Sequence, residues 1–135
     1  MNYVSNGFTL VPNSIHNAGI DLPSAVDIIL EANSATVIPT GISTAIPLQY
    51  VGLIRGRSGL AFKHGVIAFE GTIDSSYRGE IKVLLYNTSS TPYSIREGER
   101  IAQLVPIKYL VADLHKKDVL DETKRGTNGF GSSGK

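Results

Sequence analysis

Short apolar runs separated by glycine and proline dominate the pattern of this sequence, in place of long stretches with a helical period. Fourteen glycines and six prolines are spread through 135 residues, and both residue types interrupt regular elements. Apolar runs of this length, bounded by turn residues, are typical of strands. We therefore expect strands over residues 35–44, 50–56, 65–69, 80–87 and 93–110, the last broken by a turn at Glu97 and Gly98.

The fourth of these expected strands is partly apolar on both of its faces. Ile81 and Leu85 lie on one face, while Leu84 and Tyr86 lie with Lys82 on the other, because side chains alternate along a strand. Such a strand is covered on both sides or lies at a subunit contact.

Two segments, 59–64 and 111–124, can hold short helices, although neither carries a long amphipathic stripe. With at most one or two short helices, the sequence predicts an all-β fold, a β-sandwich or a jelly-roll-like barrel.

Composition narrows the class of protein. A chain of 135 residues, 41% hydrophobic and 19% charged, is the size of one domain with a real core. Its net charge of +1 argues against binding long nucleic acid by bulk electrostatics, although a local anion site stays possible. The absence of cysteine excludes disulfides, thiolate metal sites and thiol catalysis, and it fits a reducing compartment. The sequence shows neither signal-peptide features nor an apolar run long enough for a bilayer, so we expect a cytosolic protein without membrane partners.

Two aspartates stand beside apolar residues and turns. Asp21 is flanked by Ile20 and Leu22, and Asp74 follows Ile73 and opens a polar turn. Either aspartate can simply cap a turn, as most such residues do, so neither decides a function alone.

The segment "RGRSGLAFKHG", residues 55–65, carries residue types suited to an anion. The Arg57 guanidinium, the Ser58 hydroxyl and backbone amides freed by Gly59 can converge on a phosphate. An equally simple interpretation is a helix start with Ser58 as the N-cap. The spacing is not that of a Walker loop.

Gln103 lies between apolar Ile101 and Leu104 in an expected strand, so its amide needs a partner. That partner is either neighbouring backbone or a ligand. Tyr77 is a core or interface ring unless a ligand sugar stacks on it, and His64 is interpreted as a surface or packing residue, because the three histidines show no metal spacing.

Five motifs in order closely resemble those of the homotrimeric dUTP pyrophosphatases, the dUTPases, from about residue 16 to the end. The matching segments are "AGIDLPSA" (18–25), "GRSGLAFKHG" (56–65), "GTIDSSYRGEIKVLLYN" (71–87), "EGERIAQLV" (97–105) and "RGTNGFGSSG" (125–134).

This resemblance implies a distorted jelly-roll-like barrel that assembles as a trimer, with each active site drawing on all three subunits. It implies Mg²⁺-dependent hydrolysis of dUTP to dUMP and pyrophosphate, which limits uracil incorporation into DNA and supplies dUMP for dTMP synthesis. It also places the protein in the cytoplasm, or in the host cytoplasm if the source is a virus or phage.

The resemblance assigns roles by position. Asp74 matches the general base that activates water, and Asp21 matches the carboxylate that orients Mg²⁺ through its bound waters. Tyr77 matches the ring under the deoxyribose. The phosphate-binding residues correspond to Arg57, Ser58, Gly59 and Gln103. A hairpin ending near Gly71 corresponds to the one whose backbone reads uracil, and Lys82 to a further substrate contact.

The glycine-rich end matches a mobile arm that closes over a neighbouring active site. On this basis residues 1–124 form the barrel and residues 125–135 the arm. Phe130 would cover the base and Arg125 and Ser132 would contact the terminal phosphate, next to Gly131.

Three departures from the family pattern involve four positions. Gly56 replaces a common proline, Ile20 replaces a frequent aromatic residue, and Phe69 with Glu70 replaces smaller residues in the hairpin. The last change bears most on base recognition.

Two rival interpretations remain at this level. A dCTP deaminase shares the fold, but the strand 80–87 lacks an acidic residue where those enzymes resemble each other in placing a glutamate, and the chain is short for them. A non-catalytic β-barrel oligomer would explain the short apolar runs separated by glycine, but it leaves the five ordered motifs unexplained.

Overall fold

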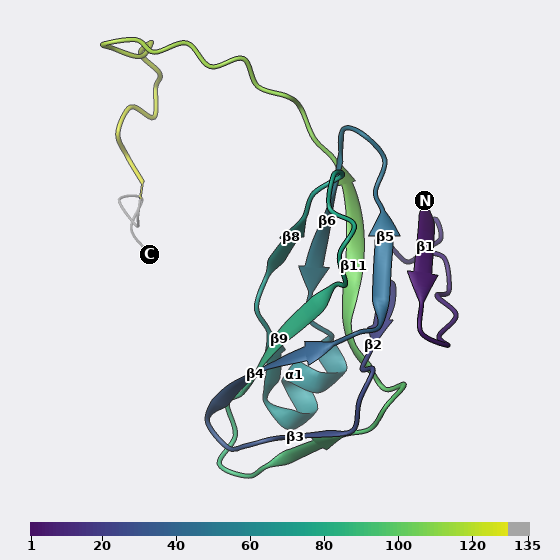
Figure 1. Ribbon diagram of the computed structural model, residues 1–135. Coiled ribbons are helices and arrows are strands. Elements are labelled where there is room, and N and C mark those ends of the chain that lie inside the picture. Colours follow the sequence, from purple (N-terminus) through teal and green to yellow (C-terminus); the bar gives the residue numbers. More distant parts are fainter. Residues whose placement is uncertain (130–135) are drawn as a thin grey trace.

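The computed structural model describes residues 1–129 of the chain, which form β-strands and one short helix (Figure 1). Phe130, Gly131 and Ser132 lie outside the described residues. The elements are β1 (Asn2–Ser5), β2 (Ile20–Pro23), β3 (Ile28–Leu30), β4 (Ser34–Pro39), β5 (Ile42–Ala45), β6 (Tyr50–Arg55), α1 (Ser58–His64), β7 (Val66–Ala68), β8 (Gly71–Ile73), β9 (Lys82–Asn87), β10 (Tyr93–Ile95) and β11 (Arg100–Lys108).

The strands form a jelly-roll-like barrel, which confirms the all-β prediction. The largest sheet has the order β2-β11-β6-β8, and a second sheet has the order β4-β9-β7, with antiparallel pairing throughout. Two short pairs, β1-β5 and β3-β10, complete the barrel. Figure 1 shows β6, β8 and β11 running side by side, with β4 and β9 crossing near them and α1 attached at one end.

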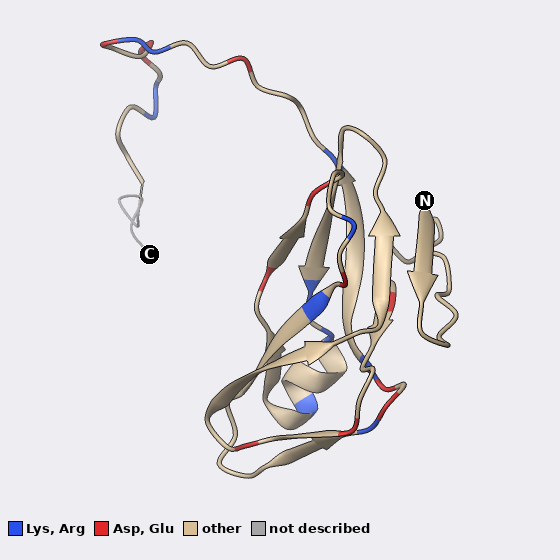
Figure 2. Cartoon of the chain, in the orientation of Figure 1, with Lys and Arg blue, Asp and Glu red and all other residues tan. Residues whose placement is uncertain are grey.

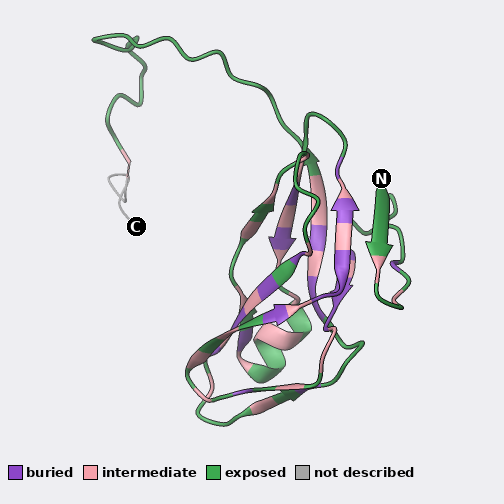
Figure 3. Ribbon diagram, viewed as in Figure 1, coloured by how far each residue is buried: buried purple, intermediate pink, exposed green. Residues whose placement is uncertain are grey.

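The core lies between these sheets and follows the alternation of the strands. On β9 and the residue before it, Ile81, Val83 and Leu85 are fully buried, whereas Leu84 and Tyr86 on the other face are half-buried. The inner face of this strand is therefore fully covered, and a subunit contact at its other face stays a prediction. Its outer face remains partly open in the single chain (Figure 3).

The strand expected over 35–44 is two strands. The chain turns at Gly41, whose φ of +67° is a left-handed conformation that favours glycine, and the buried Thr40 hydroxyl donates to the carbonyl of Ile81 at 2.6 Å. As a result, β4 pairs with β9 while β5 pairs with β1. The apolar run continues across the turn because both strands contribute to the same core.

The helix expected over 59–64 is confirmed as α1, but the helix expected over 111–124 is wrong. Residues 111–117 have no regular structure, and the rest of the segment contains only bends. A segment without a long apolar stripe has no packing surface to hold it helical. No helix within residues 1–129 is long and apolar enough to cross a membrane.

The C-terminal segment leaves the barrel after β11 (Figure 1). Tyr109 still donates its amide to the carbonyl of Gln49 at 2.9 Å, whereas the later hydrogen bonds of the described segment are local, such as Gly126 N–H to Thr123 O at 3.1 Å. Large apolar side chains on this segment are exposed, among them Leu110, Leu114 and Val119 (Figure 3). Its own barrel therefore does not bury this segment.

Candidate active site

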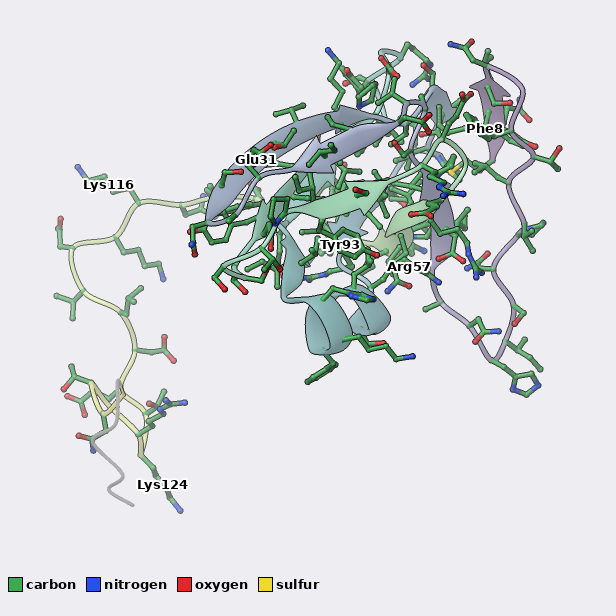
Figure 4. The ribbon with its side chains drawn as sticks, turned by 90° about the horizontal axis from the view of Figure 1, so that it is seen from below. Phe8, Glu31, Arg57, Tyr93, Lys116 and Lys124 are labelled. Atoms are coloured by element: carbon green, nitrogen blue, oxygen red, sulfur yellow. The ribbon has the colours of Figure 1, made fainter. Side chains whose placement is uncertain are left out.

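A first hollow, of about 400 Å³, lies beside α1 and collects most of the expected anion-binding residues. It is lined by Asp21, Arg57, Ser58, Gly59, Leu60, Lys63, His64 and Gln103. These residues come from β2, from both ends of α1 with the residue before it, and from β11. Sheet pairing brings β2 and β11 together. In Figure 4, Arg57 lies on the side of the barrel that carries α1, away from Lys116 and Lys124.

The start of α1 leaves backbone donors facing this hollow. The expected N-cap at Ser58 is wrong, because Arg57 is the N-cap residue and makes no capping bond with its side chain. The amides of Leu60 and Ala61 both donate to the Arg57 carbonyl at 3.1 Å. Within residues 1–129, the hydrogen bonds at this turn do not use the amides of Ser58 and Gly59. Both amides are thus available to an anion.

Nothing within residues 1–129 requires a glycine at position 59. A Cβ atom placed on it would meet no heavy atom within 4 Å, and no positive φ is recorded there. Alanine would also favour the helix by about 0.5–1 kcal/mol over glycine. The backbone at Gly59 is therefore open to close approach from the first hollow.

Asp21 sits in strand β2 and not at a turn, so its interpretation as a turn cap is wrong. Its Oδ1 lies 3.2 Å from Nε of Arg57, and its Oδ2 lies 3.1 Å from an Nη atom of Arg100. The Asp21 side chain keeps 36% of its surface exposed. Both carboxylate oxygens therefore face guanidinium groups at the rim of the first hollow.

Gln103 has the backbone partner that was one of its two expected partners, and its contact with a ligand stays a prediction. Its Nε2 donates to the carbonyl of Gly56 at 3.0 Å, which fixes the turn before Arg57, and the side chain also lines the first hollow. Gly19 allows this position, because a Cβ there would clash with the Gln103 amide oxygen.

A neighbouring hollow of about 480 Å³ shares Asp21 and Gln103 with the first and adds Arg100 and His16 to the lining. Sequence reasoning missed Arg100, Lys63 and the position of His64. The available signal for Arg100 was the pair of consecutive apolar residues that separates it from Gln103. The lining of the first hollow and this neighbour thus carries more basic than acidic side chains.

His64 packs at the edge of the first hollow against Tyr93, with ring centroids 4.7 Å apart. Burial raises the pKa of the Tyr93 hydroxyl above its usual value, and the nearby charge of Glu99 raises it further. Tyr93 is therefore neutral at physiological pH, and the contact is one of packing. Residues 1–129 contain no group of three or more His, Cys, Asp or Glu side chains that could hold a metal by themselves.

A second hollow, of about 290 Å³, collects the other expected residues. It is lined by Thr72, Ile73, Asp74, Tyr77, Glu80 and Lys82. Asp74 follows β8 and accepts the Tyr77 amide on its backbone carbonyl at 3.1 Å, so its carboxylate is not needed for the turn. The Tyr77 hydroxyl donates to the Glu80 carbonyl at 3.0 Å, and Tyr77 is 44% exposed. The exposure of Tyr77 shows that it is not a core residue, and the hydrogen bond of its hydroxyl fixes the orientation of the ring.

The segment expected to form a hairpin near Gly71 crosses between sheets instead. β7 pairs with β9 and β8 pairs with β6, so the two strands do not pair with each other. Gly71 lies close to Ile54, where a Cβ would approach the Ile54 side chain to 3.1 Å. Phe69 contacts Tyr86 edge to face, with ring centroids 6.5 Å apart, and Glu70 pairs with Arg55. The larger residues at this connection are therefore held by neighbours on both sheets.

The two hollows have no lining residue in common. Asp21 and Arg57 belong to the first, Asp74 and Tyr77 to the second, so one chain does not bring all the expected residues into one site. Arg125 lies in neither lining, and its Nε donates to the Asn128 carbonyl at 2.7 Å on the segment that leaves the barrel.

Comparison with known proteins assigns the family. The sequence model of the dUTPase family matches residues 7–134. A deoxyuridine 5'-triphosphate nucleotidohydrolase of Zymomonas mobilis is 47% identical over 119 residues, which cover 87% of this chain and 82% of that protein. The chain therefore belongs to the dUTPase family.

Solved structures agree with this assignment. The dUTPase of Staphylococcus bacteriophage 80alpha, determined with dUPNHPP, superposes with a TM-score of 0.91 at 29% identity, covering 98% of this chain and 97% of the other. A dUTPase variant from phage phi11 of S. aureus, described with a structural Mg(II) ion, gives a TM-score of 0.78 at 26% identity, over 86% and 93% of the two chains.

Proposed function

We propose that the protein hydrolyses dUTP to dUMP and pyrophosphate, with the triphosphate in the first hollow and the nucleoside against the second. The observation that carries this proposal is the sorting of residue types between the two hollows. Arginine, serine, glycine amides and lysine surround the first, as a polyanion requires. The second is lined by a tyrosine ring and two carboxylates, with a single lysine. The family assignment supports the same reaction.

Asp74 is the proposed general base. Its carboxylate is exposed in the second hollow and is not used by the turn that follows it. A water oxygen would form the new bond to phosphorus, its proton would pass to Asp74, and the bond to the pyrophosphate leaving group would break. Arg57 and the amides of Ser58 and Gly59 would stabilise the negative charge on the phosphates by donating hydrogen bonds to them.

Magnesium fits the residues at the first hollow. Mg²⁺ dehydrates reluctantly and binds substrate phosphates together with only one or two carboxylates, and Asp21 supplies a single, part-exposed carboxylate beside the proposed phosphate site. We propose that Asp21 orients the ion through its bound waters. When bound, the ion would supply neutralising charge on the triphosphate.

The site would be assembled between subunits of a trimer. Two observations support this: the two hollows are separate on one chain, and the C-terminal segment exposes large apolar side chains away from its own barrel. A neighbouring subunit can bury that segment, and the partly open outer face of β9 offers a further contact surface.

The arm is proposed to complete the site. Residues 125–135 would close over a neighbouring active site, with Phe130 over the base and Arg125 and Ser132 on the terminal phosphate beside Gly131. The glycines in this segment make ordering costly without a ligand, so closure would accompany binding.

Recognition of the nucleoside would fall to Tyr77, Lys82 and the backbone near Gly71. The Tyr77 ring is held in place by its hydroxyl bond to Glu80 and would pack under the deoxyribose. Backbone groups that pair with the uracil edge leave unmatched partners against cytosine.

The proposed partners of this protein are therefore the nucleotide dUTP and the two other subunits of a homotrimer. Basic and acidic positions are interspersed along the ribbon (Figure 2), which does not suit long nucleic acid. We place the enzyme in the cytoplasm, where a chain without cysteine meets a reducing environment. The proposed reaction is tested by pyrophosphate release from dUTP beside dTTP, dCTP and UTP.

Replacing Gly59 by alanine separates ligand binding from folding. We expect Gly59→Ala to stabilise the fold by about 0.5 kcal/mol, because alanine favours the first turn of α1. The same change is expected to weaken dUTP binding by about tenfold or more, because the added methyl group blocks the approach to the amides and their hydrogen bonds are lost. Urea unfolding and calorimetric titration measure the two effects.

The matched control is Phe62→Ala on the same helix, where the side chain is 91% exposed. This variant should leave nucleotide affinity unchanged. Equal affinity of Gly59→Ala and the natural protein would remove Gly59 from the proposed phosphate site.

A further inference from the structure

Arg100, Asp21 and Arg57 form a closed network at the rim of the first hollow. Arg100 pairs with Oδ2 of Asp21 at 3.1 Å, and Arg57 pairs with Oδ1 at 3.2 Å. The Arg57 guanidinium also donates through an Nη atom to the backbone carbonyl of Arg100 at 3.0 Å. Arg100 therefore contacts both other members, one through its side chain and one through its backbone.

A β-bulge aims Arg100 at this network. The pairing of β11 with β2 shifts between Arg100 and Ala102, so that Arg100 faces Pro23 and Ala102 faces Leu22. Ile101 and Ala102 are buried one after the other, which regular alternation does not allow. Because of the extra residue, Arg100 and Gln103 both reach the rim shared by the first hollow and its neighbour.

A triphosphate bound in the first hollow would change which groups pair with Asp21. Arg57 is the one of the two network arginines that lines the first hollow, so an anion there competes with Asp21 for the Arg57 guanidinium. If Arg57 turned to the phosphates, Asp21 would lose one partner while a polyanion arrived beside it. Arg100, which lines the neighbouring hollow, can stay on the carboxylate.

We propose that Arg100 is a positioning residue that keeps Asp21 paired and oriented, and thereby frees Arg57 to bind the triphosphate. The proposal rests on the proposed function, since it concerns the same nucleotide. Arg100 acts through Asp21, and its guanidinium, with 63% of the side-chain surface exposed, contributes little to the fold.

The test is the affinity for dUPNHPP, in which an NH group replaces a bridging oxygen of the triphosphate. Arg100→Gln is expected to weaken binding by about tenfold when Asp21 is present. In a chain that already carries Asp21→Asn, the same change should weaken binding by less than about threefold, because no carboxylate remains to be held. The coupling should appear with excess Mg²⁺ and with EDTA, because it lies between side chains of the protein.

An equal loss in both backgrounds would show that Arg100 binds the nucleotide directly, and the positioning role would be overturned. A loss explained by a fall in Tm of many degrees would also overturn it. Arg96→Gln is the matched control, because Arg96 is exposed on the other side of the same turn before β11. It should change neither affinity nor Tm.

A measurement without ligand separates this proposal from the proposed function. The Nε–H NMR signal of Arg57, identified by its shift in Asp21→Asn, should also move in Arg100→Gln and stay in place in Arg96→Gln. If the chemical shift of the Arg57 Nε–H group is unchanged in Arg100→Gln, the proposed network is refuted. Failure of the natural protein to bind dUPNHPP would instead refute the nucleotide site.

Discussion

Asp74→Asn is expected to lower the turnover of dUTP by about 10³-fold, because a positioned general base contributes roughly 10²–10⁴ to the rate. Asparagine keeps the shape of the side chain but cannot take the proton from water. The turn after β8 uses the Asp74 carbonyl and not its carboxylate, so the fold should be unaffected. Steady-state pyrophosphate release measures the loss.

Assembly and nucleotide binding should stay largely intact in this variant. Size-exclusion chromatography and the affinity for dUPNHPP provide these controls. Near-normal turnover by Asp74→Asn would show that Asp74 is not the base.

The second large effect is recovery of activity in mixed trimers. Arg57→Ala removes a phosphate contact in the first hollow and Asp74→Asn removes the base in the second, so each variant alone should be nearly inactive. If Arg57 and Asp74 of one site come from different subunits, random co-assembly leaves about one quarter of the sites with both residues intact. Co-expression of the two variants with different tags would therefore restore about one quarter of the natural activity.

Sites contained within one chain give a different result. Every chain in the mixture would then carry one defect, and the activity would not rise above that of the separate variants. The two hollows without a common lining residue favour recovery.

Strand positions could be predicted from the sequence where apolar alternation and turn residues agreed. The segments containing β6, β7 and β9 and the turn at Gly98, whose φ is +83°, follow directly from local chemistry. Strands β1, β2, β3 and β8 were missed because three or four residues give too short a pattern. The break at Gly41 was missed because the apolar run continues through it.

The sequence singled out residues that line the two hollows, but not the arrangement of the hollows. Position within five motifs led to Asp21, Arg57, Gln103 and Asp74, whereas the separation of two hollows depends on which strands pair. Arg100 was missed because its direction is set by a bulge against β2, a register that local sequence does not specify. The proposed contact of Arg125 with a neighbouring subunit would depend on residues that one chain does not bring together.

Pyrophosphate release from four nucleotides is the most direct test of the central claim. With Mg²⁺ present, dUTP should give pyrophosphate and dUMP in equal amounts, while dTTP, dCTP and UTP should give little. Thymine carries an extra methyl group, cytosine mismatches the base edge and UTP adds a hydroxyl against Tyr77. Ammonia released from dCTP, or no pyrophosphate from dUTP, would contradict the account.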